Sequence, residues 1–220
     1  MVREIPKWSS EILSIDGLVK IEEAVRDAES ATSAEIVPMI VRGSAVTGHV
    51  AIILFCFLFI LFLGLGLDEL QSQYLTNSPI WLFFDIAIFS MIAVWLSRYS
   101  FVKRQLTSNE DLYLQVGQRA ELEFYEAELN RTAGRSGVLI FLSLMEKRVV
   151  VLADKTIADK LHKTAWQEVV DILLSGLKKK NDLAQGFCDA IKSCGTLLSQ
   201  HFPIEENDTN ELRDHLIIKE

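Results

Sequence analysis

Four polar side chains gather at one end of a sheet if two apolar runs of this chain pair as a hairpin. The runs GVLIFLSL (137–144) and KRVVVLAD (147–154) are separated by a short turn. Antiparallel pairing about that turn places Gly137 opposite Asp154. The residues brought to that end of the sheet are then Arg135, Ser136, Asp154 and Lys155.

Two interpretations of this group stay open. Strand ends in α/β folds are common ligand sites, and Asp154 with Lys155 or Arg135 as a clamp is a pattern suited to a phosphate group. In the simpler interpretation, Arg135 and Asp154 form an ion pair that closes the end of the sheet.

The cysteines and histidines do not have the spacing of a metal or catalytic site. Cys56 lies in an apolar run, and Cys188 and Cys194 are six residues apart on one predicted helix. The four histidines are scattered, and the sequence has no HExxH, GxGxxG, P-loop or GxSxG pattern. We therefore predict no metal, no cofactor and no catalytic residue, with the cysteines reduced as in a cytoplasmic protein.

The elements before the long apolar region are a helix and a strand. Apolar residues at helical spacing predict a helix over 16–32, with Asp16 as its N-cap. The run AEIVPMIV (34–41) predicts a strand, in which Pro38 favours an edge or a bulge because it lacks an amide donor. One strand cannot form a sheet, so we expect it to join the hairpin at 137–154.

The remaining soluble elements are mostly helical. Thr107–Glu110 is a capping box that opens a long helix, and two more helices follow, one with an apolar stripe from Trp166 to Leu177 and one started by Asp182. The triplet 216–218 is expected to pack back on the domain and not against a partner. Because the hairpin strands are apolar on successive residues, helices should cover both faces of the sheet. The predicted fold is an α/β, three-layer αβα sandwich.

A second part of the chain has a membrane-like composition. The segment 45–97 has no Lys or Arg, although the chain carries 22 Lys+Arg against 30 Asp+Glu. Within it, 50–67 and 80–97 are apolar runs that reach about 27 Å each as helices, close to a bilayer core. The segment is therefore predicted to be a transmembrane helical hairpin that interrupts a discontinuous domain made of 1–44 and 98–220.

The charges around the hairpin predict its orientation. Arg42 precedes it and Arg98 and Lys103 follow it, while the 68–79 loop has only acidic charge. The positive-inside rule then places both termini and the globular domain in the cytoplasm, as a multi-pass membrane protein with the 68–79 loop on the other side of the membrane. The acidic net charge of −8 excludes nucleic acid as the main partner.

Asp85 is the one ionisable residue inside a predicted span. A carboxylate in a bilayer is costly, which makes it a candidate for a transport or proton role. Its place one turn after Trp81, near the predicted outer interface, also fits snorkelling or a contact between helices.

Several segments resemble the TPM-domain family, in its bacterial branch with a membrane hairpin inserted after the first strand. They are SAEIVPMIV, RTAGRSGVLIFLSLMEKRVVVLADKTI, AWQEVV, GFCDAIKSCGTLLSQHFP and DTNEL. The resemblance implies an αβα sandwich, frequent description as a phosphatase, and in some members divalent-cation binding at a sheet end. It also implies roles in assembling membrane complexes, and a LemA-like coiled-coil protein as a partner. Where such members commonly have an Asp-Asn pair, this chain has Arg135 and Ser136, which removes a cation ligand.

The leading hypothesis is a membrane-anchored, non-catalytic interaction module that docks other membrane-complex proteins at the cytoplasmic face. One alternative is a phosphatase acting on small phosphomonoesters through Asp154. Another is an accessory subunit of a transport or redox complex that works through Asp85.

Overall fold

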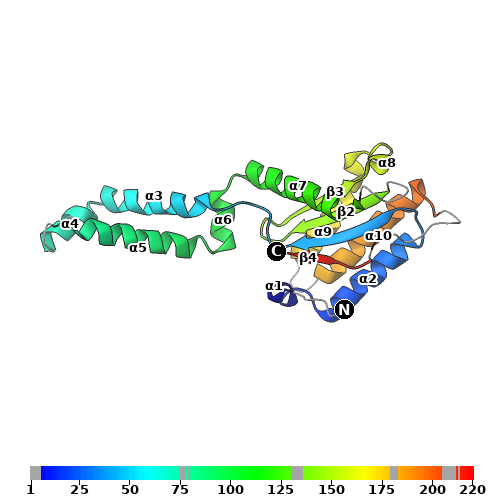
Figure 1. The fold of residues 1–220 in the computed structure, drawn as a ribbon, viewed down its shortest axis with the longest axis horizontal. Helices are drawn as coiled ribbons and strands as arrows, with labels where there is room; N and C mark the ends of the chain where they lie inside the picture. The colour runs from blue at the N-terminus through cyan, green and yellow to red at the C-terminus, as the bar shows by residue number, and fades with distance from the viewer. Residues whose placement is uncertain are drawn as a thin grey trace. The chain divides into compact units, whose positions relative to one another are not determined.

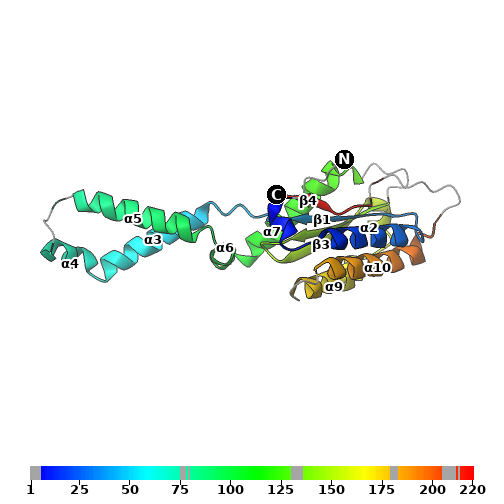
Figure 2. The same ribbon diagram turned by 90° about the horizontal axis from the view of Figure 1, so that it is seen from below.

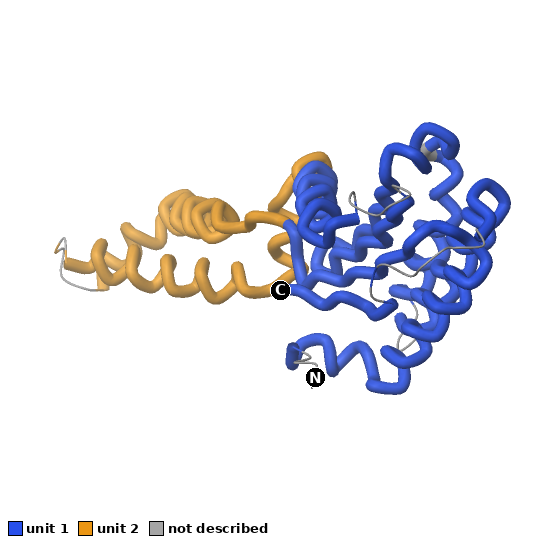
Figure 3. The backbone as a smooth tube through the Cα atoms, turned by 45° about the vertical axis from the view of Figure 1, so that its right-hand side comes forward, with its two compact units in different colours: residues 1–44, 113–220 blue, residues 45–112 orange. Residues whose placement is uncertain are grey.

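The computed structural model describes residues 6–74, 78, 80–129, 136–178, 183–204, 212 and 214–220. The chain divides into two compact units, coloured separately in Figure 3. Unit 1 comprises residues 1–44 and 113–220, and unit 2 comprises residues 45–112. Unit 2 thus contains the whole segment 45–97 that was predicted to be a membrane hairpin, together with residues 98–112.

Unit 1 is built on a mixed four-stranded sheet with the order β3-β2-β1-β4. Its strands are β1 (Glu35–Val41), β2 (Gly137–Ser143), β3 (Arg148–Ala153) and β4 (Ile217–Lys219). β1 pairs in parallel with β2 and β4, and β2 pairs antiparallel with β3. Val138 pairs with Ala153, which is the register predicted for the hairpin.

Helices cover both faces of this sheet, so the α/β class is confirmed. On one face lie α2 (Ile15–Glu29), α9 (Gln167–Lys178) and α10 (Leu183–His201), which Figure 2 shows together on one side of β1. The opposite face is packed against α7 (Asn109–Glu126). The short elements of unit 1 are α1 (Lys7–Ser10), α8 (Lys155–Ala158) and a 3₁₀ turn, η2 (Lys163–Trp166).

Two clusters of buried apolar residues join the sheet to these helices. Alternate residues of the strands enter each cluster because side chains of a strand point to opposite faces in turn. Ile36, Ile40 and Ile140 face α2, α9 and α10, while Met39 and Phe141 face α7. Every residue of β2 is buried, as expected for a strand that is covered on both sides.

Two predicted helix caps are wrong by one or two residues. The N-cap of α2 is Ser14, whose Oγ accepts a hydrogen bond from the Gly17 amide at 3.1 Å, and Asp16 lies in the first turn. At the start of α7, the Ser108 hydroxyl oxygen accepts the bond from the Glu110 amide at 3.3 Å. Thr107 instead ends the preceding helix, so it forms no capping box with Glu110. The predicted start of α10 at Asp182 lies outside the described residues.

The C-terminal triplet packs back on the domain as predicted, by adding strand β4 to the sheet. β4 pairs with β1 at Met39, Ile40 and Val41. The earlier part of β1, which contains Pro38, has β2 as its strand partner among the described residues. β1 is therefore an interior strand and not the edge strand that Pro38 favoured; Pro38 lies just before the residues of β1 that pair with β4.

Unit 2 contains two long apolar helices that pack on each other and two shorter helices that carry charged residues. They are α3 (His49–Gly64), α4 (Leu67–Tyr74), α5 (Ile80–Leu96) and α6 (Ser100–Leu106), labelled in Figure 1. Phe59 and Phe62 of α3 contact Phe89 of α5, with ring centroids 6.2 and 5.3 Å apart. In the described chain no single helix is long and apolar enough to cross a bilayer; the bent pairs α3–α4 (64°) and α5–α6 (101°) meet the criteria of length and composition.

Candidate functional site at the end of the sheet

The hairpin register brings Ser136 and Asp154 to the same end of the sheet, as the sequence predicted. The Asp154 amide donates to the Gly137 carbonyl at 2.9 Å, so Asp154 lies opposite the residue that follows Ser136. Lys155 comes next as the exposed first residue of α8. Arg135 lies outside the described residues, and its predicted ion pair with Asp154 stays a prediction.

Ser136 connects the starts of β1 and β2. Its hydroxyl donates to the Ser33 carbonyl at 2.9 Å, and its own carbonyl accepts from the Glu35 amide at 3.1 Å. The residue is only 6% exposed. Because the hydroxyl proton is donated to a backbone carbonyl, Ser136 is a poor nucleophile. Its bonds instead hold the starts of β1 and β2 together.

Asp154 begins α8 as its N-cap. One carboxylate oxygen, Oδ1, accepts from the Lys155 amide at 2.6 Å, which satisfies an amide at the start of the helix. The other oxygen, Oδ2, is buried and has no hydrogen-bond partner among the described residues. A buried oxygen without a donor is costly, so this is the polar atom of the site that lacks compensation.

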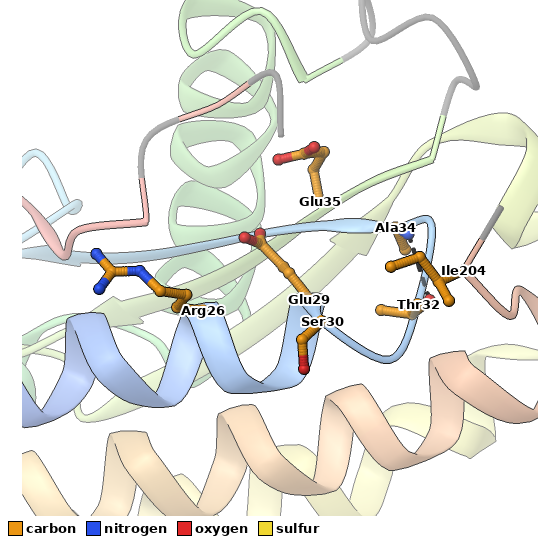
Figure 4. Close-up of a pocket in the computed structure, with 7 residues that line it drawn as sticks. All are labelled: Arg26, Glu29, Ser30, Thr32, Ala34, Glu35 and Ile204. Atoms are coloured by element: carbon orange, nitrogen blue, oxygen red, sulfur yellow. Dashed lines mark hydrogen bonds between the residues drawn. The ribbon is translucent and has the colours of Figure 1, made fainter. Parts of the chain in front are cut away.

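A pocket that the sequence did not indicate lies at the turn from α2 into β1. It has a volume of about 240 Å³, and Figure 4 shows its lining residues: Arg26, Glu29, Ser30, Thr32, Ala34, Glu35 and Ile204. The pocket adjoins Ser136 through the bond to Glu35 described above. Six of the seven lining residues lie within 26–35, and the seventh, Ile204, follows α10. No recognised motif marks this stretch; Glu35, an acidic residue at the start of an apolar strand, was the available signal.

The charged groups of the pocket are engaged in holding the fold. Glu29 Oε1 accepts from the Ile36 amide at 2.7 Å, and Glu35 Oε2 accepts from the Leu212 amide at 3.4 Å. Arg26 donates to Asp214 Oδ2 at 3.3 Å. These bonds tie α2, β1 and the C-terminal segment together.

The described residues do not fit a divalent-cation site. Ca²⁺ needs six to eight oxygen ligands, and among these residues no group of three or more His, Cys, Asp or Glu is placed to hold a metal. Ser136 donates its proton elsewhere, and Asp154 uses one oxygen as a helix cap. The cation binding implied by the family resemblance therefore finds no support in this part of the chain.

The cysteines are structural or exposed thiols. Burial raises the pKa of Cys194 to about 12, and burial also raises the pKa of Cys188, so neither forms a reactive thiolate near neutral pH. Cys56 lies exposed on α3 in unit 2. None of the three cysteines is close in the sequence to Ser136 or Asp154, the residues of the candidate site.

Comparison with known proteins gives a fold but no family. No protein-family model matches the chain, and no curated protein matches it. A solved structure that does match is the NMR structure of the BA42 protein from the psychrophilic bacterium Bizionia argentinensis sp. nov.. It is 19% identical, with a TM-score of 0.58, and the match covers 94% of each chain. At this identity the likeness shows a shared fold and carries no information on activity.

Proposed function

We propose that this chain is a membrane-anchored, non-catalytic interaction module. Unit 2 is its anchor, and unit 1, a TPM-like sandwich, docks other membrane-complex proteins at the cytoplasmic face of the bacterial inner membrane. A LemA-like coiled-coil protein is a candidate partner. The resemblance noted in the sequence supports the family assignment, and unit 2 supports the anchor.

The observation that carries the anchor is the exposed apolar surface of unit 2. Phe57, Ile60 and Phe83 are 61%, 68% and 72% exposed, and they are three of many such side chains on α3 and α5. Keeping a large apolar side chain in water costs about 1.5–3 kcal/mol relative to burying it. The two helices already use their facing sides against each other, and a lipid cover for their outer sides is what the anchor proposal supplies.

The non-catalytic half of the proposal rests on what the polar groups of unit 1 do. Ser136, Glu29 and Glu35 bond to backbone groups, and Asp154 caps a helix. Groups committed to the backbone hold the fold together and are poorly placed to exchange protons with a substrate. No observation among the described residues favours the phosphatase alternative.

Cys56 provides a built-in test of the anchor. In membrane vesicles Cys56 should resist a polar maleimide until detergent is added, because hydrocarbon excludes the reagent. The matched control Cys56→Ser measures labelling of the buried Cys188 and Cys194. In the Cys56→Ser background, Ser72→Cys in α4 should react in intact cells, since the proposed topology places the segment between α3 and α5 outside the cytoplasm. Rapid labelling of Cys56 in unopened vesicles would contradict the anchor.

Extraction in mild detergent tests the interaction role. A defined particle with stoichiometric partner chains is expected, and its mass should fall when those partners are removed genetically. A chain extracted alone would contradict the role in docking and would make hydrolysis of phosphomonoesters the next assay, with Asp154→Ala as the control.

A further inference from the structure

Strand β3 forms one edge of the sheet in unit 1. β3 is the outermost strand on one side of the sheet, next to β2. Its sequence, RVVVLA, has five apolar residues in six, and all six residues are partly exposed. Protected edge strands usually carry a proline, a bulge or a charge in mid-strand. β3 has none of these between Arg148 and Ala153, which makes it an edge suited to pairing with another strand.

The hydrogen bonds of the hairpin identify which backbone groups face outward. The Asp154 amide donates to the carbonyl of the opposite Gly137. Hydrogen-bonded pairs alternate along an antiparallel ladder, so Leu152, Val150 and Arg148 also bond to β2. The intervening residues, Val149, Val151 and Ala153, therefore point their amide and carbonyl groups away from β2. No bond between described residues uses these outward groups.

We propose that the outer edge of β3 binds a second copy of this chain, in an antiparallel pairing centred on Val151. In this register Val151 faces Val151 of the second copy, and Val149 faces Ala153. All three are outward residues, so every hydrogen bond of the new ladder is formed. The contact is two-fold symmetric, and it joins two four-stranded sheets into one.

Charge at the two ends of β3 selects this register over its neighbours. The same pairing places Arg148 of one copy opposite Asp154 of the other, once at each end of the contact. By alternation both side chains lie on the sheet face that carries α7, where the Arg148 guanidinium already lies 5.7 Å from the Tyr113 ring centre. A shift of two residues would separate these opposite charges and leave strand residues unpaired.

Lys147 and Lys155 do not oppose this contact. Lys147 lies in the turn with a positive φ of 53°, and Lys155 has entered α8, so both are outside the paired strands. Their long side chains reach solvent, where like charges interact weakly.

A disulfide between two different single variants tests the register. Arg148→Cys and Asp154→Cys are each made in the full-length Cys56→Ser protein, purified, mixed and mildly oxidised. Facing residues of a non-hydrogen-bonded pair have Cα atoms about 4.5 Å apart, within disulfide reach. Equal residues of the two copies are about 20 Å apart at 3.3 Å per residue, so neither variant alone should cross-link. The expected result is a disulfide-linked dimer only when Arg148→Cys and Asp154→Cys are mixed. Equal yields of linked dimer from the mixture and from either variant alone would overturn the proposal.

Val151→Pro gives an independent test by particle mass. Its amide faces outward, so proline removes a donor of the dimer ladder and none of the bonds to β2. The variant should be half the mass of the parent by sedimentation or light scattering while keeping its circular dichroism. Val151→Thr is the matched control that keeps the amide and should stay dimeric. A parent chain that is monomeric, or a Val151→Pro protein that is folded and dimeric, would also overturn the proposal.

Discussion

A single buried carboxylate links the last strand to the body of unit 1. Glu123 of α7 is fully buried, and its oxygens bond to Arg119, at 2.7 Å, and to the Lys219 amine of β4. Lys219 also bonds to the exposed Glu126 at 2.8 Å. We call Glu123, Glu126 and Lys219 the C-terminal clasp. A buried charge is tolerated only with such partners, so β4 is held by charge as well as by its strand pairing.

The clasp predicts how stability depends on pH. The hydrogen bond and charge of Lys219 hold the pKa of Glu126 below its usual 4.5, so that contribution is present above pH 4.5 and is lost as the pH falls through the lowered pKa. Burial alone would lower the pKa of Lys219, but the bonds and charges of Glu123 and Glu126 raise it above 10.5. The contribution of Lys219 is therefore full below pH 10.5 and is lost as the pH rises through the raised pKa.

Lys219→Met should lower the free energy of unfolding of unit 1 at pH 7 by about 1–3 kcal/mol, because Glu123 loses a charged donor while remaining buried. The loss should shrink above pH 10.5, where Lys219 of the parent also loses its charge. Urea unfolding followed by circular dichroism measures both. Glu126→Gln is the matched control and should change stability little, since that carboxylate is exposed. Equal stability of Lys219→Met and parent at pH 7 would show that the clasp does not hold β4.

At the scale of elements, the sequence predicted what depends on local pattern. The register of β2 and β3 followed from a short turn between two apolar runs, because a turn of known length leaves one pairing. The joining of β1 to this hairpin also followed, since a lone strand needs a sheet, whereas its parallel pairing with β2 was not predicted. The caps were missed because Ser14 competes with Asp16, and Ser108 with Thr107, for the same role, and only the backbone angles decide between them.

What the sequence could not predict depends on distant residues. β4 was expected to pack back, but its position beside β1 is fixed by residues far along the chain, including the clasp. The pocket is formed mainly by the turn from α2 into β1, and only Ile204 in its lining comes from far along the chain. In the candidate site, the register placed Ser136 and Asp154 correctly, whereas the bond from Ser136 to the Ser33 carbonyl required the tertiary structure.

Asp85 tests whether unit 2, which we propose to be a membrane anchor, has a further role in the whole molecule. Its Oδ1 accepts a hydrogen bond from Gln71 Nε2 of α4 at 3.4 Å, so the carboxylate links α5 to the helix that follows α3. Such a link stabilises the far end of the hairpin and needs an acceptor oxygen and no charge. Asparagine keeps that oxygen and removes the charge and the titratable proton.

Asp85→Asn should therefore leave membrane insertion, abundance and the mass of the extracted particle unchanged, because the bond to Gln71 is retained. Asp85→Leu, which has no acceptor, should lower abundance by leaving Gln71 without its partner in an apolar setting. Quantitative immunoblotting of membranes and sizing of the extracted particle measure these outcomes. If Asp85→Asn instead abolished a cellular function at normal abundance and particle mass, the charge itself would be required. Unit 2 would then be a working part of a transport or redox assembly and not an anchor alone.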